Sequence, residues 1–205
     1  MAGIRLIVGL GNVGAAYENT RHNAGFWFVD QVADQNGASF TSESRFHGMV
    51  AKVSVGGRPV WLLKPSTLMN LSGRSVAAIA NFYKIDLEDI LVAHDELDMM
   101  PGQAKLKQGG GVAGHNGLKD IRKSCGGDNF WRLRLGIGHP RELNLRQPVA
   151  DFVLRPPSPE HTREIEDAMT AALARIPLLV AGEIREAMQA LHRDVGKPKT
   201  GKPDG

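Results

Sequence analysis

The sequence predicts an α/β fold, a single three-layer domain in which helices flank a mixed β-sheet. Short, apolar, β-rich runs alternate along the chain with amphipathic stretches of helical length, which is typical of this class. The paired glycines Gly56-Gly57 separate two strand-like runs, residues 46–55 and 59–63. We therefore expect a β-hairpin and a sheet that is not all parallel. The 205 residues, 42% of them hydrophobic, suffice for one core without disulfides or a structural metal.

The predicted elements follow one another from the N-terminus. Residues 4–8 form an apolar, β-rich run that Gly9 stops, so we expect a buried strand there. The next apolar period predicts a helix that Thr20 caps, that runs to about Gln35 and that Gly37 ends. After the hairpin we expect a helix over residues 72–83, a buried strand over 90–93 that delivers His94-Asp95-Glu96 to its carboxyl end, a helix over 115–124 and a strand over 132–137.

The C-terminal part is predicted to be helical and then disordered. Ser158 followed by Pro159 is typical of a helix start, and we expect Pro177 to divide the long amphipathic region that follows. Residues 194–205 are rich in Lys, Pro and Gly, so we expect a disordered basic tail. The chain is thus predicted to hold one folded domain, residues 1–193, and that tail.

Charge and cysteine content narrow the class of protein. The formal net charge is only +3, but residues 103–134 carry seven Lys or Arg against two Asp, while residues 85–102 carry six acids and no Lys or Arg. The single Cys125 cannot form an internal disulfide, and the N-terminus shows no signal-peptide pattern. No apolar run approaches the ~20 residues of a membrane helix. We expect a cytoplasmic protein without a membrane segment.

The loop after the first strand matches a nucleotide-binding pattern. Residues 9–14 have the form G-x-G-x-x-G. In the dinucleotide fold the helix begins inside this motif and an acid ends a second strand ~20 residues on, whereas here the helix is delayed and Asp30 falls within it. We therefore rank a nucleotide site low. The loop instead brings a polar set to the strand end, where ligands bind in α/β sheets: Asn12, Tyr17, Thr20, Arg21, His22 and Asn23.

Four separated segments combine polar side chains with glycines or strand ends. They hold Asn12 with His22, then Asn70, then His94-Asp95, then residues 114–117. If they converge, the set contains a His that can act as a base, a carboxylate that can orient it, and carboxamides that can grip an amide or ester backbone.

The same set lacks other kinds of catalytic group. There is no G-x-S-x-G motif for a hydrolase serine, and Cys125 has no obvious His partner. The seven His show no H-x-x-x-H or H-E-x-x-H spacing, so we expect no metal. The reaction class that these residues still allow is direct attack by water, with a His as general base.

Five blocks of residues follow one another at consistent separation. They are Gly9-Leu10-Gly11-Asn12 with Tyr17 and Thr20-Arg21-His22-Asn23; Lys64-Pro65 with Met69-Asn70-Leu71-Ser72-Gly73; His94-Asp95-Glu96-Leu97; Gly109-Gly110-Gly111 with Gly114-His115-Asn116-Gly117-Leu118-Lys119; and Arg132-Leu133-Arg134 with Gly136-Ile137-Gly138-His139-Pro140. Together they resemble the bacterial peptidyl-tRNA hydrolase family, from residue 4 to about residue 192. The resemblance implies cleavage of the ester between peptide and tRNA, in the cytoplasm, without metal or cofactor. We expect a monomer.

The resemblance also implies a role for each matching residue. His22 would be the general base, Asp95 would orient its imidazole, and Asn12 would help to hold the ester carbonyl and its oxyanion. Asn70 and Asn116 would bind the main chain of the C-terminal peptide residues. Such a backbone grip suits a substrate of arbitrary peptide sequence.

Further residues are expected at the edges of this site. Tyr17, Met69 and His115 lie in the matching blocks, so we assign them to substrate binding. Lys107 and Arg134 stand where the family clamps the 5′-phosphate of the tRNA, a contact that recognises RNA without reading its sequence.

Some positions depart from the family, and some explanations stay open. Val13 replaces the usual Pro, which loosens the loop but leaves Asn12 in place. Leu68 replaces an aromatic residue and Met99-Met100 replace smaller residues or Pro, and we expect these changes to reshape the pocket rim without removing a polar group. Asn12, Asn70, Asp95 and Asn116 could also be turn or cap residues, and Lys107 and Arg134 solvated cations. The main alternative function is a catalytically inactive RNA-binding relative of the same fold.

Overall fold

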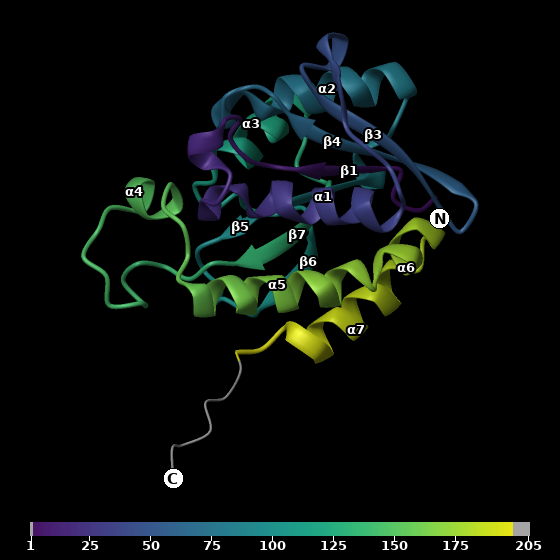
Figure 1. Ribbon diagram of the computed structural model, residues 1–205. Helices are drawn as coiled ribbons and strands as arrows, with labels where there is room; N and C mark the ends of the chain where they lie inside the picture. The colour runs from purple at the N-terminus through teal and green to yellow at the C-terminus, as the bar shows by residue number, and fades with distance from the viewer. Residues whose placement is uncertain (1, 199–205) are drawn as a thin grey trace.

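The computed structural model describes residues 2–198, and its centre is a seven-stranded β-sheet (Figure 1). In spatial order the strands are β2 (Thr41–Glu43), β3 (Gly48–Val55), β4 (Arg58–Pro65), β1 (Leu6–Gly9), β5 (Ile90–Glu96), β7 (Trp131–Gly136) and β6 (Ala104–Gln108). Strands β4, β1, β5 and β7 run parallel, and the strands at both edges are antiparallel to their neighbours. The predicted mixed sheet is confirmed.

Helices cover both faces of this sheet. The α-helices among the described residues are α1 (Ala24–Gln35), α2 (Ser72–Tyr83), α3 (Asn116–Cys125), α4 (Val149–Val153), α5 (Pro159–Leu173), α6 (Ile176–Ala181) and α7 (Ile184–Val195). Leu6 and Val8 of β1 pack into the core under α2 and α3, whereas Ile7 packs into the core under α1 and α5 to α7. Figure 1 shows α2 and α3 together on one side of the sheet and α5 to α7 together on the other. The three-layer prediction is confirmed.

The first helix begins later than predicted, and its predicted cap is wrong. A 3-10 turn over Arg21–Asn23 precedes α1, and no side chain caps the helix. The hydroxyl of Thr20 instead donates to the carbonyl of Tyr17 over 2.8 Å. A Thr suits a local turn bond as well as a helix cap, so the sequence pattern could not separate the two.

The central elements follow the sequence closely, with two strands added. Gly56 and Gly57 both have positive φ, as a tight hairpin turn between β3 and β4 requires. Strand β5 runs on through His94, Asp95 and Glu96, three residues past the predicted end. Strands β2 and β6 were not predicted, because β2 is short and partly exposed and β6 is recognisable mainly by its pairing with β7.

The C-terminal region forms three helices. The hydroxyl of Ser158 accepts the amide of His161 at the predicted start of α5, and Pro177 lies in the first turn of α6. The predicted boundary at residue 194 is wrong, because α7 includes Asp194, which pairs with Arg175. Residues 196–198 follow α7, where the carbonyl of Gly196 accepts the side-chain amide of Gln103, and residues 199–205 lie outside the described residues.

Strands β6 and β7 have one apolar face and one basic face. Ala104, Leu106, Leu133 and Leu135 of β6 and β7 face the core under α5 and α7. Side chains alternate along a strand, so the intervening Lys and Arg residues of β6 and β7 lie on the opposite face.

Between residues 2 and 198, no helix is both long enough and apolar enough to cross a membrane.

Candidate active site

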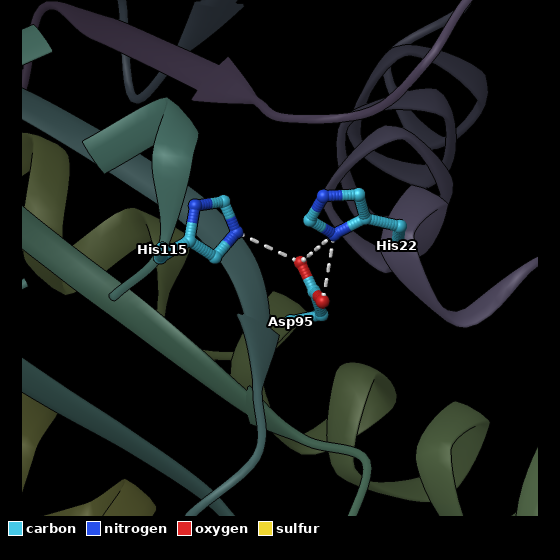
Figure 2. A group of neighbouring side chains, drawn as sticks. All are labelled: His22, Asp95 and His115. Carbon is cyan, nitrogen blue, oxygen red and sulfur yellow. Dashed lines mark hydrogen bonds and ion pairs between the residues drawn. The ribbon is translucent and has the colours of Figure 1, made fainter. Parts of the chain in front are cut away.

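Three side chains from distant parts of the chain meet at the carboxyl ends of β1 and β5 (Figure 2). His22 comes from the 3-10 turn before α1, Asp95 from β5, and His115 from the N-cap position of α3. Gly25 makes the approach of α1 possible: a Cβ on it would lie 2.3 Å from the carbonyl oxygen of Ala93. The start of α1 can therefore lie directly against β5, which brings His22 to Asp95.

Both histidines bind the same carboxylate. The Nδ1 atom of His22 lies 2.9 Å from Oδ2 and 3.0 Å from Oδ1 of Asp95. The Nε2 atom of His115 lies 2.9 Å from Oδ1 of Asp95. The Nδ1 atom of His115 accepts the backbone amides of Gly117 and Leu118, so its proton must be on Nε2, which donates to Asp95.

The electrostatics favour a negative Asp95 and a basic His22. The Asp95 side chain is only 2% exposed, and burial alone would raise its pKa, but His22 and His115 hold that pKa well below its usual range. Burial disfavours the charged form of His22, but the charge and hydrogen bond of Asp95 outweigh this effect and raise the pKa of His22. Because Nδ1 of His22 faces Asp95, its Nε2 lies on the far side of the ring, as Figure 2 shows. This nitrogen can take a proton.

His94 contacts both the backbone of Asp95 and the ring of His115. Its Nδ1 donates to the backbone carbonyl of Asp95 over 2.9 Å, and its ring lies 5.2 Å from the ring of His115. Burial, together with His115, lowers the pKa of His94 to about 3, so it is neutral. Sequence reasoning missed this structural role, although His94 directly precedes Asp95.

A hollow of about 420 Å³ opens over the cluster. Its walls come from the end of β5, the loop before α3, the segment after β7 and helix α4. Asn116 lines it and is exposed. The turn that carries His22 is tied to α4, because buried Arg21 donates to the carbonyls of Phe152 and Arg155.

Asn12 is held beside His22 by a neighbour. The backbone amide of Asn12 donates to Oδ1 of Asn23 over 2.7 Å, and Nδ2 of Asn23 donates to the carbonyl of Asn12 over 3.0 Å. Asn23 is buried and directly follows His22. The sequence placed Asn23 in the polar set but did not identify this clamp, which leaves the Asn12 side chain uncommitted and lining an adjacent cleft.

The remaining predicted substrate-binding residues lie on short turns. Asn70 is exposed and Met69 is buried in the 3-10 turn Met69–Leu71. A Cβ on Gly117 would lie 2.8 Å from Sδ of Met69, so this turn packs on the start of α3, next to Asn116. Tyr17 is exposed on the 3-10 turn Ala15–Tyr17.

Lys107 and Arg134 line a second hollow of about 240 Å³, on the face of β6 and β7 that carries the basic residues. Glu96, Asp98 and Ala113 line both this hollow and the one over His22, so the two adjoin. Lys107 is exposed, whereas Nε of Arg134 donates to Oε1 of Glu96 over 2.7 Å. The fork at the end of Arg134 is therefore fixed in direction.

Arg132 lies beneath this hollow and was not predicted. It is buried, and its guanidinium donates to the carbonyls of Gly110, Gly111 and Asp128. It thus holds the glycine-rich loop that connects Lys107 to His115. The signal in the sequence was its place two residues before Arg134.

His22, Asp95 and His115 are also a group that could be considered for a metal ion, because their candidate ligand atoms lie within 4.8 Å of one another. Nε2 of His115 is a donor, since its Nδ1 accepts two amides, and a protonated nitrogen cannot bind a metal. The hydrogen bonds fit a catalytic pair better than an ion.

Comparison with known proteins is consistent across sequence and structure. A family model described as peptidyl-tRNA hydrolase matches residues 6–200. The chain is similar to the peptidyl-tRNA hydrolase of Bordetella avium, 58% identical over 189 residues that cover 92% of this chain and 91% of the relative. It is likewise similar to that of Variovorax paradoxus, 52% identical over 200 residues that cover 98% and 93%.

The fold is similar to a crystal structure of peptidyl-tRNA hydrolase from Acinetobacter baumannii. The TM-score is 0.90 and the sequence identity 46%, and the match covers 96% of this chain and 98% of the other.

Proposed function

The chain belongs to the peptidyl-tRNA hydrolase family and hydrolyses the ester between peptide and tRNA, and we propose that His22, oriented by Asp95, is the general base of this reaction. The observation that carries the proposal is the 2.9 Å hydrogen bond from Nδ1 of His22 to a buried carboxylate. That bond fixes the tautomer in which Nε2 is unprotonated and can accept a proton from water.

The reaction then proceeds by direct attack of water. The water oxygen bonds to the ester carbonyl carbon while its proton passes to Nε2 of His22. The charge of Asp95 stabilises the imidazolium that forms. The tetrahedral intermediate collapses by breaking the bond to the ribose oxygen, which takes the proton back from Nε2. The products are a peptide with a free carboxyl group and a tRNA with a free terminal hydroxyl.

The carboxamides supply the polar contacts that this intermediate needs. Asn12, with its backbone clamped by Asn23, donates to the developing oxyanion. Asn116 at the start of α3 and Asn70 on the 3-10 turn that packs on it bind the main chain of the peptide, with Tyr17 and Met69 at the margin. His115 acts through Asp95 as a second donor that holds the carboxylate in place.

The basic hollow takes the tRNA phosphate. Lys107 supplies a free ammonium group, and Arg134 supplies a fork that Glu96 holds in one direction. We assign these contacts to positioning of the RNA rather than to sequence recognition. We further propose that the folded domain, which extends through α7, acts as a cytoplasmic monomer without metal or cofactor.

Hydrolysis of a tRNA charged with an N-acetylated amino acid tests the mechanism. His22→Ala should lower kcat by ~10²–10⁴-fold, and by more than Asn12→Ala, for which we expect ~10²–10³-fold. Equal losses would mean that another group is the base. Unchanged activity of His22→Ala would end the mechanism, and absence of hydrolysis by the wild type would favour the inactive RNA-binding alternative, which no comparison supports.

A further inference from the structure

A second cleft of about 420 Å³ begins at Asn12 and shares no lining residue with the hollow over His22. Its walls include the apolar side chains of Phe26 and Trp27 of α1 and Met49 of β3. Half of its lining residues are polar or charged, namely Asn12, Glu18, Asn23, Asp30, Lys64 and Ser66. None of the catalytic roles assigned above uses this space, apart from Asn12 itself.

The order of strands places this cleft on the opposite side of the catalytic residues from the basic hollow. The cleft lies at β1 and β4, where Asn12 and Lys64 line it. The basic hollow lies at β5, β7 and β6. Because β1 and β7 flank β5 on its two sides, the cleft and the basic hollow lie on opposite sides of Asp95 along the strand order.

The charges of the two regions differ in sign. Lys64 is the one Lys or Arg that lines the cleft, and its Nζ lies 2.6 Å from Oδ1 of Asp30 and over the ring of Phe40. Glu18 adds a second carboxylate, so the cleft repels a phosphate backbone. The basic hollow instead has three cations against two acids.

We propose that this cleft binds an apolar side chain of the peptide, at a residue before the one linked to tRNA. The proposal rests on the function proposed above, in which Asn12 faces the ester. The RNA half of the substrate then extends toward Lys107, and the peptide half extends past Asn12 over Phe26 and Trp27. The enzyme accepts all sequences through main-chain contacts but cleaves some faster.

The expected preference for an apolar side chain follows from the burial of apolar surface. A Leu side chain that enters the cleft stabilises the bound substrate in proportion to the apolar surface that it removes from water. Gly has no side chain and adds no such binding free energy. For a cleft that stays partly open we expect about a tenfold difference in kcat/KM between the two. A main-chain grip alone would produce no such difference.

The test compares tRNAs carrying N-acetylated dipeptides with the same ester-linked residue and either Leu or Gly before it. Wild-type enzyme should cleave the Leu substrate about tenfold faster in kcat/KM. Trp27→Ala and Met49→Ala should each bring this ratio toward one while leaving the Gly substrate within about twofold of wild type. Phe82→Ala, which removes an exposed aromatic side chain of α2 outside the cleft, should keep the ratio.

The outcomes separate this inference from the function on which it rests. Equal rates for Leu and Gly in the wild type, or a ratio that both variants preserve, would overturn the peptide subsite. If the variants instead lose one constant factor on every substrate, including a tRNA with a single N-acetylated residue, the cleft binds the RNA end and the inference is wrong. If the wild type cleaves none of the substrates, the proposed function itself has failed. Thermal unfolding of each variant shows whether it is folded. If one of Trp27→Ala and Met49→Ala does not fold, the other still tests the subsite.

Discussion

Two hydrogen bonds join the side chain of Asn23 to the backbone of Asn12. The amide of Asn12 donates to Oδ1 of Asn23 over 2.7 Å, and Nδ2 of Asn23 donates to the carbonyl of Asn12 over 3.0 Å. Asn23 directly follows His22, so the turn that carries the proposed base and the loop that carries the proposed oxyanion donor are fixed to each other. This relationship links two segments that the sequence separates by ten residues or so, and it makes the geometry of the site testable.

Replacing Asn23 with Ala should impair catalysis more than folding. The variant frees the loop around Asn12, so we expect kcat to fall by about tenfold or more, with a loss of ~1–3 kcal/mol in the free energy of unfolding. Steady-state kinetics and urea denaturation measure the two effects. Asn19→Ala is the matched control, because Asn19 is exposed in the neighbouring loop. Wild-type kcat in Asn23→Ala would show that the clamp does not position Asn12.

Replacing Asp95 with Asn should remove the tautomer control of His22. An amide carries no negative charge, and its NH2 group can donate to Nδ1 of His22, so the tautomer with Nε2 unprotonated is no longer enforced. We expect kcat to fall by ~10²–10⁴-fold. Asp98→Asn is the control, since Asp98 lines the same hollow without contacting either ring in the described structure. Similar kcat values for the two variants would remove Asp95 from the mechanism.

The pH dependence of kcat/KM should report the raised pKa of His22. A general base works only when it is unprotonated, so activity should fall as the pH drops through that pKa. Asp95 favours the charged imidazolium and raises this pKa above its ordinary value of 6.5. The acid limb of the wild-type profile should therefore lie above pH 6.5, and the residual activity of Asp95→Asn should have its limb at lower pH. A shift in the opposite direction contradicts the assignment.

Replacing Lys107 with Ala should weaken the salt dependence of tRNA binding. Each phosphate contact contributes ~0.7–0.9 to the slope of log K against log salt, so the slope should become shallower by about that amount. Lys52→Ala, on β3 and over the ring of Trp61, removes an exposed cation away from the basic hollow and should leave the slope unchanged. If Lys107→Ala also leaves it unchanged, Lys107 is a solvated charge.

Replacing Gly25 with Ala should destabilise the fold. The added Cβ would lie 2.3 Å from the carbonyl oxygen of Ala93 and 2.5 Å from the amide nitrogen of Leu10, both rigid backbone atoms. We expect a loss of about 3 kcal/mol or more in the free energy of unfolding, measured by urea denaturation. Gly111→Ala is the control, because nothing lies within 4 Å of its Cβ position. A Gly25→Ala variant as stable as wild type would mean that α1 need not touch β5.

Most of the fold was predictable because its signals are local. The helix over residues 72–83 matches α2 in both bounds, since its apolar period is complete within those residues. The glycine pair predicted the hairpin through the backbone conformation that its turn requires. Strand β6 was missed because its ladder with β7 exists only in the folded chain, and Thr20 was misassigned because two local bonds compete for the same hydroxyl.

The sequence alone determined which residues could do the chemistry: a His, a carboxylate and several carboxamides, each near a glycine or at the end of a predicted strand. It also determined the family, because the motif blocks keep their order and separation. Only the tertiary structure decided which atoms face one another. That Nδ1 of His22 meets Asp95, that His115 shares the same carboxylate, and that Glu96 holds Arg134 depend on how strands and helices pack. The physical reason is that periodicity and turn preference act over a few neighbouring residues, whereas His22 and Asp95 are 73 positions apart and Arg21 and Arg155 are 134 positions apart.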